Sequence, residues 1–418
     1  MSSGAPHPPR DDADAMRWVA NVLLGELADD PDIVVGRKAP SGHHVLWTFS
    51  MLPGGDDPYV LIPADAPRAA AAAVHGLGNP LRSRDRAVEA AAGLAMRARV
   101  GPRFAPSLVV SAPGPVARHR TLPGHLATLL GRDDAVCAVI LGRRRPNRKP
   151  VLKMLAPDGE VLAYAKVGWN DLTENLVRAE ADAMARIAAA APRTFRLPRV
   201  LASGPWGGLE LLVTAPAPAA GRGDGPPLRM PGDATREIAA IQGLEHGTFA
   251  GSAYRVGLVS RLEAGEPDDT TALLRQTLTW LDEAWGQEEE IPFGSWHGDW
   301  MPWNLLRSGT DLWVWDWERS ASGVPVGLDA AHFRFDIESK IRGRSPADAA
   351  ASSAGWTERV GPDLGARPGS GRALAVANLL EMCLRFREGR QAGMEAKDVA
   401  YVRAMGSLIF VGSGGTGA

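Results

Sequence analysis

A tryptophan-rich segment at residues 295–306, SWHGDWMPWNLL, restricts the possible folds more than any other part of the chain. It places His297, Asp299 and Asn304 among three tryptophans and a proline. A buried core has no need of a carboxylate and an amide, and a solvated loop has no need of large rings. The pattern therefore predicts a loop whose polar atoms are held in place by aromatic packing, as a functional site requires.

The residues after this loop predict a hairpin that returns to it. A short strand leads to a turn at Ser308–Gly309, and a second strand, LWVW, ends just before Asp316. Asp316 is therefore expected beside the loop. The side-chain oxygens of Asn304 and Asp316 suit Mg²⁺, a hard ion that is bound together with nucleotide phosphates. Asp299 is then left to orient a hydroxyl group and to accept its proton.

The loop HGDWMPWN, followed by VWDWE, resembles the catalytic loop and metal-binding segment of the aminoglycoside phosphotransferase / choline kinase-like family. These proteins are small-molecule relatives of the protein kinases, which have H-R-D-x-x-x-x-N and D-F-G at the same places. The resemblance covers residues 130–340 and, more loosely, the helices after them, but not residues 1–120. It implies an α+β, protein kinase-like bilobal fold, with a small antiparallel sheet lobe and a mainly helical lobe.

The order of the expected elements divides the chain into four parts. A small antiparallel sheet with one helix is predicted by strands at 135–141, 151–155, 160–169 and 208–215 and a helix at 170–190. Proline- and glycine-rich stretches at 111–124 and 215–232 are the natural boundaries. We therefore expect a disordered tail (1–15), an additional N-terminal α/β region of unknown role (16–120), a kinase-like N-lobe (121–215) and a mainly helical C-lobe with the catalytic loop and metal-binding strand (216–418).

The resemblance also implies a strand lysine that contacts the α/β-phosphates of the nucleotide, and a helix glutamate that holds this lysine. In VLAYAKVGW, strand alternation puts Lys166 on one face with Leu162 and Tyr164. Lys166 is therefore the candidate, and an exposed strand lysine without a role is the alternative. Glu174 and Glu180 compete for the role of its partner.

Helical geometry favours Glu180 over Glu174. At about 100° per residue, Glu180 falls on an otherwise apolar stripe. The apolar members of the stripe are Leu176, Ala179, Ala183 and Ile187. A carboxylate in such a place needs a partner, so we expect an ion pair between Lys166 and Glu180. Glu174 lies on the other side, three residues after Asp171, where a capping box would place it.

The loop GRRRPNRKP between the first two of these strands departs from the Gly-rich loop of kinases, because Gly142 is its one glycine. In one interpretation the basic residues that follow Gly142 meet the nucleotide phosphates by charge, where backbone N–H groups usually do. These residues are Arg143, Arg144, Arg145, Arg148 and Lys149. A solvated basic hairpin loop is the alternative. Tyr164 is bulkier than the alanine common in protein kinases at this place, which leaves ATP and GTP both open.

Four further residues around the motif are considered for a role in the site or in its support. His297 belongs to the catalytic loop with Asp299, and we expect it to hold the loop rather than to carry a proton. Trp300 either contacts the acceptor or packs inside the loop. Glu318 is a second metal ligand, a substrate contact or a structural hydrogen-bonding group. Asp329 precedes AAHFRF and is expected to be a helix N-cap.

Composition excludes several classes of function. The chain has 46 basic and 48 acidic residues and a net charge of −2, so no electrostatic footprint for nucleic acid is expected. No apolar run is long enough for membrane insertion, and the start of the chain lacks a secretory signal pattern. Two cysteines, Cys137 and Cys383, are too few for a disulfide framework. We expect a cytoplasmic protein.

The function expected from these residues and the resemblance is an ATP- or GTP-dependent, Mg²⁺-assisted kinase of a small-molecule hydroxyl. The acceptor is of the aminoglycoside, sugar or amino alcohol type. A protein kinase is disfavoured, since WERSASGVPVGLDAAHF leaves no room for an activation segment. A catalytically inactive, kinase-like regulatory or binding module is the alternative. The acceptor's identity, the role of residues 16–120 and the oligomeric state are not decided by the sequence.

Overall fold

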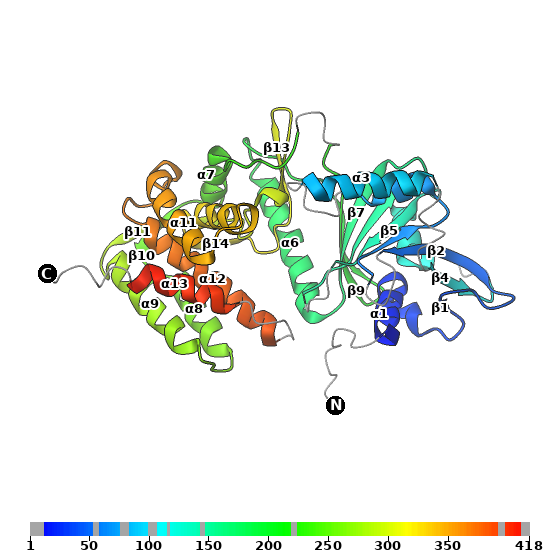
Figure 1. The fold of residues 1–418 in the computed structure, drawn as a ribbon, viewed down its shortest axis with the longest axis horizontal. Coiled ribbons are helices and arrows are strands. Elements are labelled where there is room, and N and C mark those ends of the chain that lie inside the picture. The colour runs from blue at the N-terminus through cyan, green and yellow to red at the C-terminus, as the bar shows by residue number, and fades with distance from the viewer. Residues whose placement is uncertain are drawn as a thin grey trace. The chain divides into compact units, whose positions relative to one another are not determined.

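The computed structural model describes residues 12–52, 58–75, 83–98, 107–114, 118–142, 147–218, 224–391 and 398–410. The chain forms two compact units, the first from residues 1–181 and 198–219, the second from residues 182–197 and 220–418. The first contains a large antiparallel sheet and the second is mainly helical (Figure 1). The expected α+β class is therefore confirmed.

The sheet of the first unit has nine strands in the order β1-β4-β2-β3-β5-β6-β7-β9-β8, and each neighbouring pair is antiparallel. Its first four strands are β1 (Val34–Gly36), β2 (His44–Leu52), β3 (Val60–Pro63) and β4 (Ser107–Ala112). The other five are β5 (Val136–Ile140), β6 (Val151–Leu155), β7 (Val161–Gly168), β8 (Val200–Trp206) and β9 (Leu209–Thr214). The sheet is thus larger than the small one expected.

The stretch at 111–124 does not separate two sheets, because strands on either side of it pair with each other. Val60 of β3 lies opposite Ile140 of β5, and Leu61 lies opposite Val139. Without β3, the β5 edge would present unpaired backbone N–H and C=O groups. The N-terminal strands therefore continue the sheet that carries Lys166.

Helices cover both faces of this sheet. The buried side chains of α1 (Asp12–Leu24) and α5 (Leu122–Leu129) share one apolar core with alternate residues of β2, β5, β6, β7 and β9. Residues of α2 (Pro67–Ala73) and α3 (Ser83–Arg97) share a second core with the opposite face of β3 and β5. The short 3₁₀ helices are η1 (Gly25–Asp29) and η2 (Arg118–Arg120). Helix α6 (Asp171–Ala189) follows β7.

Helix α1 is anchored by Trp18, whose ring contacts Arg148 and Trp169 at the β5–β7 part of the sheet. The guanidinium carbon of Arg148 lies 4.4 Å from the centre of the Trp18 ring, and Trp169 packs edge-on at 5.6 Å. Arg148 donates from Nε to Leu141 O, and its own carbonyl accepts from Trp169 Nε1 at 2.7 Å. Arg148 is therefore buried against α1, which neither the phosphate-contact interpretation nor the solvated-loop alternative expects.

The second unit combines short strands with seven α-helices among its described residues. The strands are β10 (Glu245–Thr248), β11 (Glu290–Trp296) and β14 (Ala321–Pro325), which form one sheet, and β12 (Leu305–Ser308) and β13 (Asp311–Val314), which form a hairpin. The helices are α7 (Gly232–Ala240), α8 (Ala253–Ala264), α9 (Thr271–Trp285), α10 (Leu328–Asp336), α11 (Pro346–Val360), α12 (Gly371–Gln391) and α13 (Asp398–Phe410). Shorter helices are η3 (Pro302–Asn304), the π-helix η4 (Ile337–Ile341) and η5 (Pro362–Leu364).

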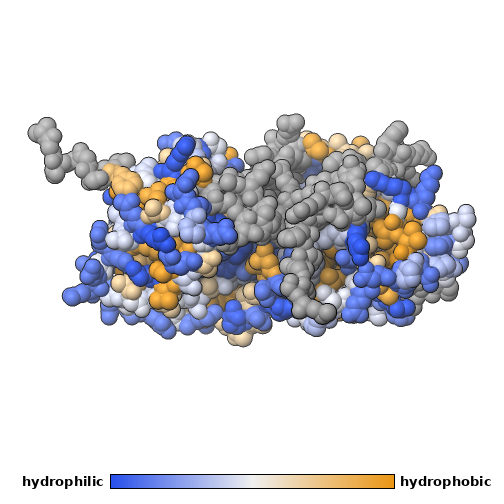
Figure 2. Space-filling model, turned by 90° about the horizontal axis from the view of Figure 1, so that it is seen from below, coloured by the Kyte–Doolittle hydropathy of each residue, from blue (hydrophilic) through white to orange (hydrophobic). Residues whose placement is uncertain are grey.

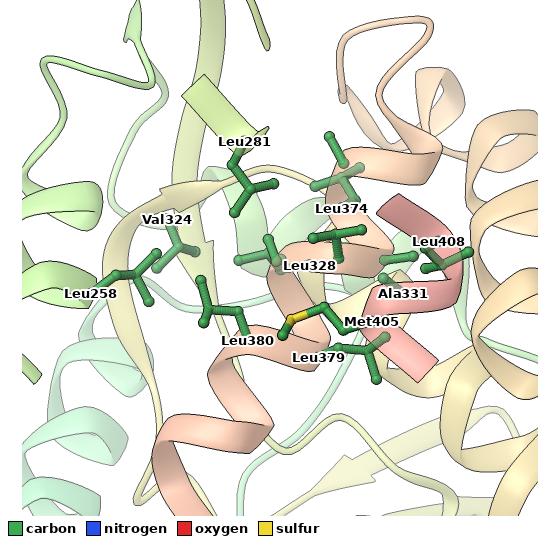
Figure 3. Packing of buried hydrophobic residues seen from close by; sticks show 14 of the residues in the cluster. Leu258, Leu281, Val324, Leu328, Ala331, Leu374, Leu379, Leu380, Met405 and Leu408 are labelled. Atoms are coloured by element: carbon green, nitrogen blue, oxygen red, sulfur yellow. The ribbon is translucent and has the colours of Figure 1, made fainter. Parts of the chain in front are cut away.

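The core of the second unit forms where α10 packs against α12. Leu328 and Ala331 of α10 lie among leucines of α12 and Met405 of α13 (Figure 3). Leu258 of α8 and Val324 of β14 extend the same cluster. Close packing of this kind fixes the rotation of a helix, so the other side chains of α10 are held in defined directions.

On the face shown in Figure 2, hydrophilic residues cover most of the described surface of each unit, and hydrophobic residues form separate groups. None of the helices in the described part of the chain is both long and apolar enough to span a bilayer.

Replacing Trp18 with alanine tests whether α1 belongs to the sheet unit. Trp18 is 6% exposed, and loss of a buried ring of this size lowers the free energy of unfolding by about 3 kcal/mol. Urea denaturation followed by circular dichroism measures the change. Val88→Ala on α3 is the control, because Val88 is 62% exposed. Equal midpoints for Trp18→Ala and the parent would show that α1 is not part of the core.

Candidate active site

The tryptophan-rich loop and the end of the hairpin lie side by side, as the sequence predicts. The loop connects β11 to β12, and β12 pairs with β13 from Leu305↔Val314 to Ser308↔Asp311. Beyond β13, the backbone N–H of Trp315 donates to Asn304 O at 3.2 Å. Asp316 follows directly, so it leaves the hairpin next to the loop.

Asp316 has a backbone conformation that is unusual for its residue type. Its φ is 71°, and Ala191 is the other non-glycine residue with positive φ among those described. Aspartate tolerates this region better than most residues, and such strain is concentrated at functional sites. A carboxylate oxygen of Asp316 and one of Glu318 lie within 4.8 Å of each other. The two acidic groups after the hairpin thus face a common place.

Asp299 is held at both its backbone and its side chain. The Asn304 Nδ2 donates to Asp299 O at 2.8 Å and to Asp299 Oδ2 at 2.9 Å. The Asp299 side chain keeps 25% of its surface exposed. It is therefore oriented by the protein and still accessible to another molecule. Because Nδ2 of Asn304 donates to Asp299, the Oδ1 atom is the one that the amide can offer to a cation.

His297 holds the loop through both ring nitrogens. Its Nε2 donates to Trp315 O at 3.0 Å, and its Nδ1 accepts from the backbone N–H of Asp299 at 3.2 Å. Burial lowers the pKa of His297, so the ring is neutral. A ring with both nitrogens committed to backbone groups has no proton to exchange with a substrate. We therefore assign His297 a positioning role and no proton transfer.

Asp329 was expected to cap a helix, and this expectation was wrong. The N-cap of α10 is Gly327, and Asp329 lies in the first helical turn. Its Oδ2 accepts from the backbone N–H of His297 at 2.7 Å, and its Oδ1 accepts from that of Gly298 at 3.0 Å. A buried carboxylate with two such bonds fixes the start of the catalytic loop.

Gly298 is required by the close approach of another backbone segment. Its φ is +79°, and a Cβ at this position would lie 2.3 Å from Arg319 O. The carbonyl of Gly298 accepts from Arg385 Nη1 of α12 at 2.7 Å. Three separate elements therefore hold the two residues before Asp299.

The tryptophans of the motif pack around His297. The Trp317 ring lies 4.4 Å and the Trp300 ring 5.4 Å from the His297 ring, measured between centroids. Both tryptophans are fully buried. Trp300 therefore packs inside the loop, as its packing interpretation expects. Trp303 is only partly buried, and Lys340 Nζ lies 5.4 Å from its ring centre.

The ion pair expected in the first unit is present. Lys166 Nζ donates to Glu180 Oε1 at 2.7 Å and to Oε2 at 2.6 Å. Glu180 is buried at 2% exposure. Gly168 allows the end of β7 to lie against the first turn of α6, because a Cβ there would lie 2.6 Å from Glu174 Cα.

Glu174 has a structural role, but not as part of a capping box. The capping box at the start of α6 is formed by Asn170, whose Oδ1 accepts from Thr173 N, and Thr173, whose hydroxyl accepts from Asn170 N. Glu174 pairs with Arg178 at 2.8 Å on the surface of the helix. The box is therefore one residue earlier than expected.

The loop between β5 and β6 is described at its two ends. Gly142 has a φ of +69°, and its N–H donates to Tyr59 O at 3.1 Å. Arg143, Arg144 and Arg145 lie outside the described residues. Lys149 is partly buried.

The sheet face that carries Lys166 also carries Tyr164 and Lys153. Alanines 163 and 165 point to the opposite core, and Tyr164 lies across from Lys153 in the β6–β7 register. Lys153 Nζ lies 5.9 Å from the Tyr164 ring centre and donates to Ala72 O at 2.8 Å and His75 O at 3.2 Å. The N-terminal helix α2 thus ends against the face of the sheet that bears Lys166.

The charges around Asp299 keep its carboxyl group ionised. Burial raises the pKa of Asp299, but a hydrogen bond and charge from His332 and the charges of Arg385 and Lys340 outweigh it. The pKa of Asp299 is therefore held well below its ordinary value. The carboxylate is an acceptor for a hydroxyl proton and only a weak base.

The residues at the end of the hairpin suit a hard cation. Asn304 presents an amide oxygen, and Asp316 and Glu318 present carboxylate oxygens. Oxygen donors of these kinds fit Mg²⁺, which also keeps waters and binds phosphate oxygens.

The sequence analysis misassigned Asp329 and did not identify two other polar side chains of α10, His332 and Asp336. Asp329, His332 and Asp336 recur at spacings of three and four in LDAAHFRFD. This places them along one side of a helix whose other residues are mostly apolar. Buried polar groups require partners, so the pattern indicates a polar contact, although it does not name the partner.

Comparison with known proteins gives similarity at the level of structure only. No family model and no curated protein sequence gives a significant match. A thermostable mutant of aminoglycoside phosphotransferase APH(4)-Ia, in its apo form, is 16% identical with a TM-score of 0.48, over 70% of this chain and 100% of that chain. Amicoumacin kinase hAmiN, in complex with AMP-PNP, Ca²⁺ and Ami, is 10% identical with a TM-score of 0.41, over 66% and 88%. Glucosamine kinase, in complex with glucosamine, ADP and inorganic phosphate, is 16% identical with a TM-score of 0.37, over 71% and 86%.

Replacing Asp329 with alanine tests its role as the anchor of the loop. Two buried backbone N–H groups would lose their acceptor, so the free energy of unfolding should fall by about 3 kcal/mol. Thermal and urea unfolding measure the loss. Asp233→Ala on α7 is the control, because the Asp233 side chain is 82% exposed, and it should leave the midpoint unchanged. A stable Asp329→Ala variant would contradict the assignment.

Proposed function

We propose that this chain is a small-molecule kinase that transfers the γ-phosphoryl group of ATP or GTP to a hydroxyl group. The observation that carries the proposal is the state of Asp299. Its carboxylate is ionised, oriented by Asn304 and still partly exposed, and Asp316 lies beyond the same loop. An accessible acid with an adjacent set of oxygen donors is what phosphoryl transfer to an alcohol requires.

Asp299 would act on the acceptor. The hydroxyl group of the acceptor donates a hydrogen bond to the Asp299 carboxylate, which points its oxygen at the γ-phosphorus. The new O–P bond forms while the bond between the γ-phosphorus and the β,γ-bridging oxygen breaks. The hydroxyl proton passes to Asp299, and the nucleoside diphosphate leaves. Because the transition state is loose, a weak base is sufficient and orientation matters more.

The nucleotide would be held by Lys166 and by a cation. Lys166, fixed by Glu180, places its ammonium group for the α/β-phosphates. Asn304 and Asp316, with Glu318 as a further oxygen donor, would hold Mg²⁺. When bound, this ion neutralises charge on the phosphate oxygens. The acceptor is a small hydroxylated molecule such as an aminoglycoside, a sugar or an amino alcohol.

The Asp299→Asn variant tests the proposed chemistry. The variant keeps a side chain of the same shape but loses the proton acceptor, so kcat should fall by a factor of about 10² to 10⁴. The assay follows transfer of labelled γ-phosphate to a panel of sugars, amino sugars, aminoglycosides and amino alcohols in the presence of Mg²⁺. Calorimetry with a non-hydrolysable nucleotide should show unchanged binding.

The matched control for this variant is Asp311→Asn on β13. Asp311 belongs to the same hairpin, and its side chain is 48% exposed, so activity should be retained. Nucleotide binding by the parent without transfer to any acceptor, and without hydrolysis, would favour an inactive binding module. Equal kcat values for Asp299→Asn and the parent would refute the role of Asp299.

The Glu180→Gln variant tests the ion pair with Lys166. Without the carboxylate, the ammonium group loses its fixed position, and kcat/KM for the nucleotide should fall about 100-fold. Steady-state kinetics with varied nucleotide measures this change. Glu174→Gln is the matched control, since Glu174 lies on the same helix and pairs with Arg178 instead. Similar losses in both variants would mean that the effect comes from helix stability.

A further inference from the structure

His332 faces the catalytic carboxylate from the middle of α10. Its Nε2 lies 3.5 Å from Asp299 Oδ1 and 3.5 Å from Asp336 Oδ2. Its Nδ1 lies 3.0 Å from Asn378 Oδ1 of α12. The His332 side chain is 2% exposed. Asn304 holds the other oxygen of Asp299, so each carboxylate oxygen faces a different side chain.

The surroundings of His332 require a charged ring. A neutral imidazole has one N–H donor and one lone pair, and here both nitrogens face oxygen atoms. In either neutral tautomer, one lone pair would point at an oxygen acceptor. Only the doubly protonated ring donates toward Asn378 on one side and toward the two carboxylates on the other.

Charge balance leads to the same conclusion. Asp336 is fully buried, and its Oδ2 accepts from Lys340 Nζ at 2.9 Å. With a neutral His332, the three carboxylates Asp299, Asp329 and Asp336 would face only two positive groups, Lys340 and Arg385. Uncompensated buried charge is strongly unfavourable. An imidazolium gives three positive and three negative groups.

We propose that His332 is a positively charged positioning residue for Asp299. Its imidazolium holds Oδ1 of the carboxylate while Asn304 holds Oδ2, and this fixes the direction in which Asp299 receives the acceptor hydroxyl. The inference rests on the proposed function for its catalytic consequence. The charge state of the ring does not rest on it.

Deprotonation of His332 should therefore lower kcat at alkaline pH. The groups that face the ring are Asp299 of the loop, Asp329 and Asp336 of α10, Lys340 of η4 and the neutral Asn378 of α12. Burial lowers the pKa of His332, but the two nearest carboxylates outweigh it and raise the pKa above its ordinary value. The stabilisation is complete below the pKa of the unfolded chain and is lost as pH rises through the higher folded value.

Nuclear magnetic resonance of the full chain with ¹⁵N-labelled histidine tests the charge directly. Signals that disappear in His332→Gln belong to His332. We expect both ring nitrogens to be protonated at neutral pH. A ring with one bare nitrogen at neutral pH would overturn the proposal, whether or not the protein transfers phosphate.

Kinetics test the positioning role. His332→Gln should lower kcat by roughly 10–100-fold, leave KM for the nucleotide nearly unchanged and remove the alkaline decrease that the parent shows. Asn378→Asp adds a negative charge beside Nδ1 and should move that decrease to higher pH. A purely structural role would not produce this shift. His246→Gln on β10 is the control, because His246 is exposed and should leave the pH profile unchanged.

The outcomes separate this proposal from the proposed function. If the parent transfers phosphate, Asp299→Asn does not, and His332→Gln keeps the parental kcat and pH profile, the positioning role is refuted while the kinase function stands. If His332→Gln does not fold, the pH shift in Asn378→Asp decides, and an unshifted profile refutes the proposal. If the parent transfers no phosphate to any acceptor, the proposed function fails and the resonance spectrum still decides the charge of the ring.

Discussion

The geometry of the catalytic loop depends on two hydrogen bonds to one buried carboxylate. Asp329 accepts from the backbone N–H groups of His297 and Gly298, and so it sets the path of the chain immediately before Asp299. A carboxylate in the interior is stable only when such donors surround it. The bonds therefore stabilise the loop and the helix that carries Asp329 together, and a shift of either would leave three polar groups without partners.

Helix α10 joins this anchor to the hydrophobic core. Leu328 and Ala331 pack among the leucines of α12 (Figure 3). Asp329 and His332, one residue after each, face the loop that carries Asp299. Core packing admits little rotation of a helix, so the apolar contacts determine where the polar side chains point. Stability and the orientation of Asp299 thus come from adjacent faces of the same helix.

Local sequence patterns were sufficient to predict some contacts of the site but not others. The Lys166–Glu180 pair followed from strand alternation and helical periodicity, because both residues lie on elements adjacent in the chain. The sequence also predicted that Asp316 lies beside the loop that contains Asn304, because a tight hairpin joins the two. Asp329 reaches residues 31 and 32 positions away, and such a contact depends on tertiary packing that periodicity does not encode. The pattern in LDAAHFRFD indicates a buried partner without naming it.

The N-terminal region could not be placed from sequence for a similar reason, since a proline-rich stretch predicts a boundary and says nothing about strand pairing. In the sheet, β3 covers the edge of β5, and Lys153 donates to the carbonyls of Ala72 and His75 at the end of α2. A lysine there complements the partial negative charge of a helix C-terminus. Burial lowers the pKa of Lys153 to about 8, and the charge of Glu89 on α3 opposes this. Because Lys153 shares a sheet face with Lys166, the N-terminal region is part of the structure that supports this face, and its removal would leave an open strand edge and a buried cation without these acceptors.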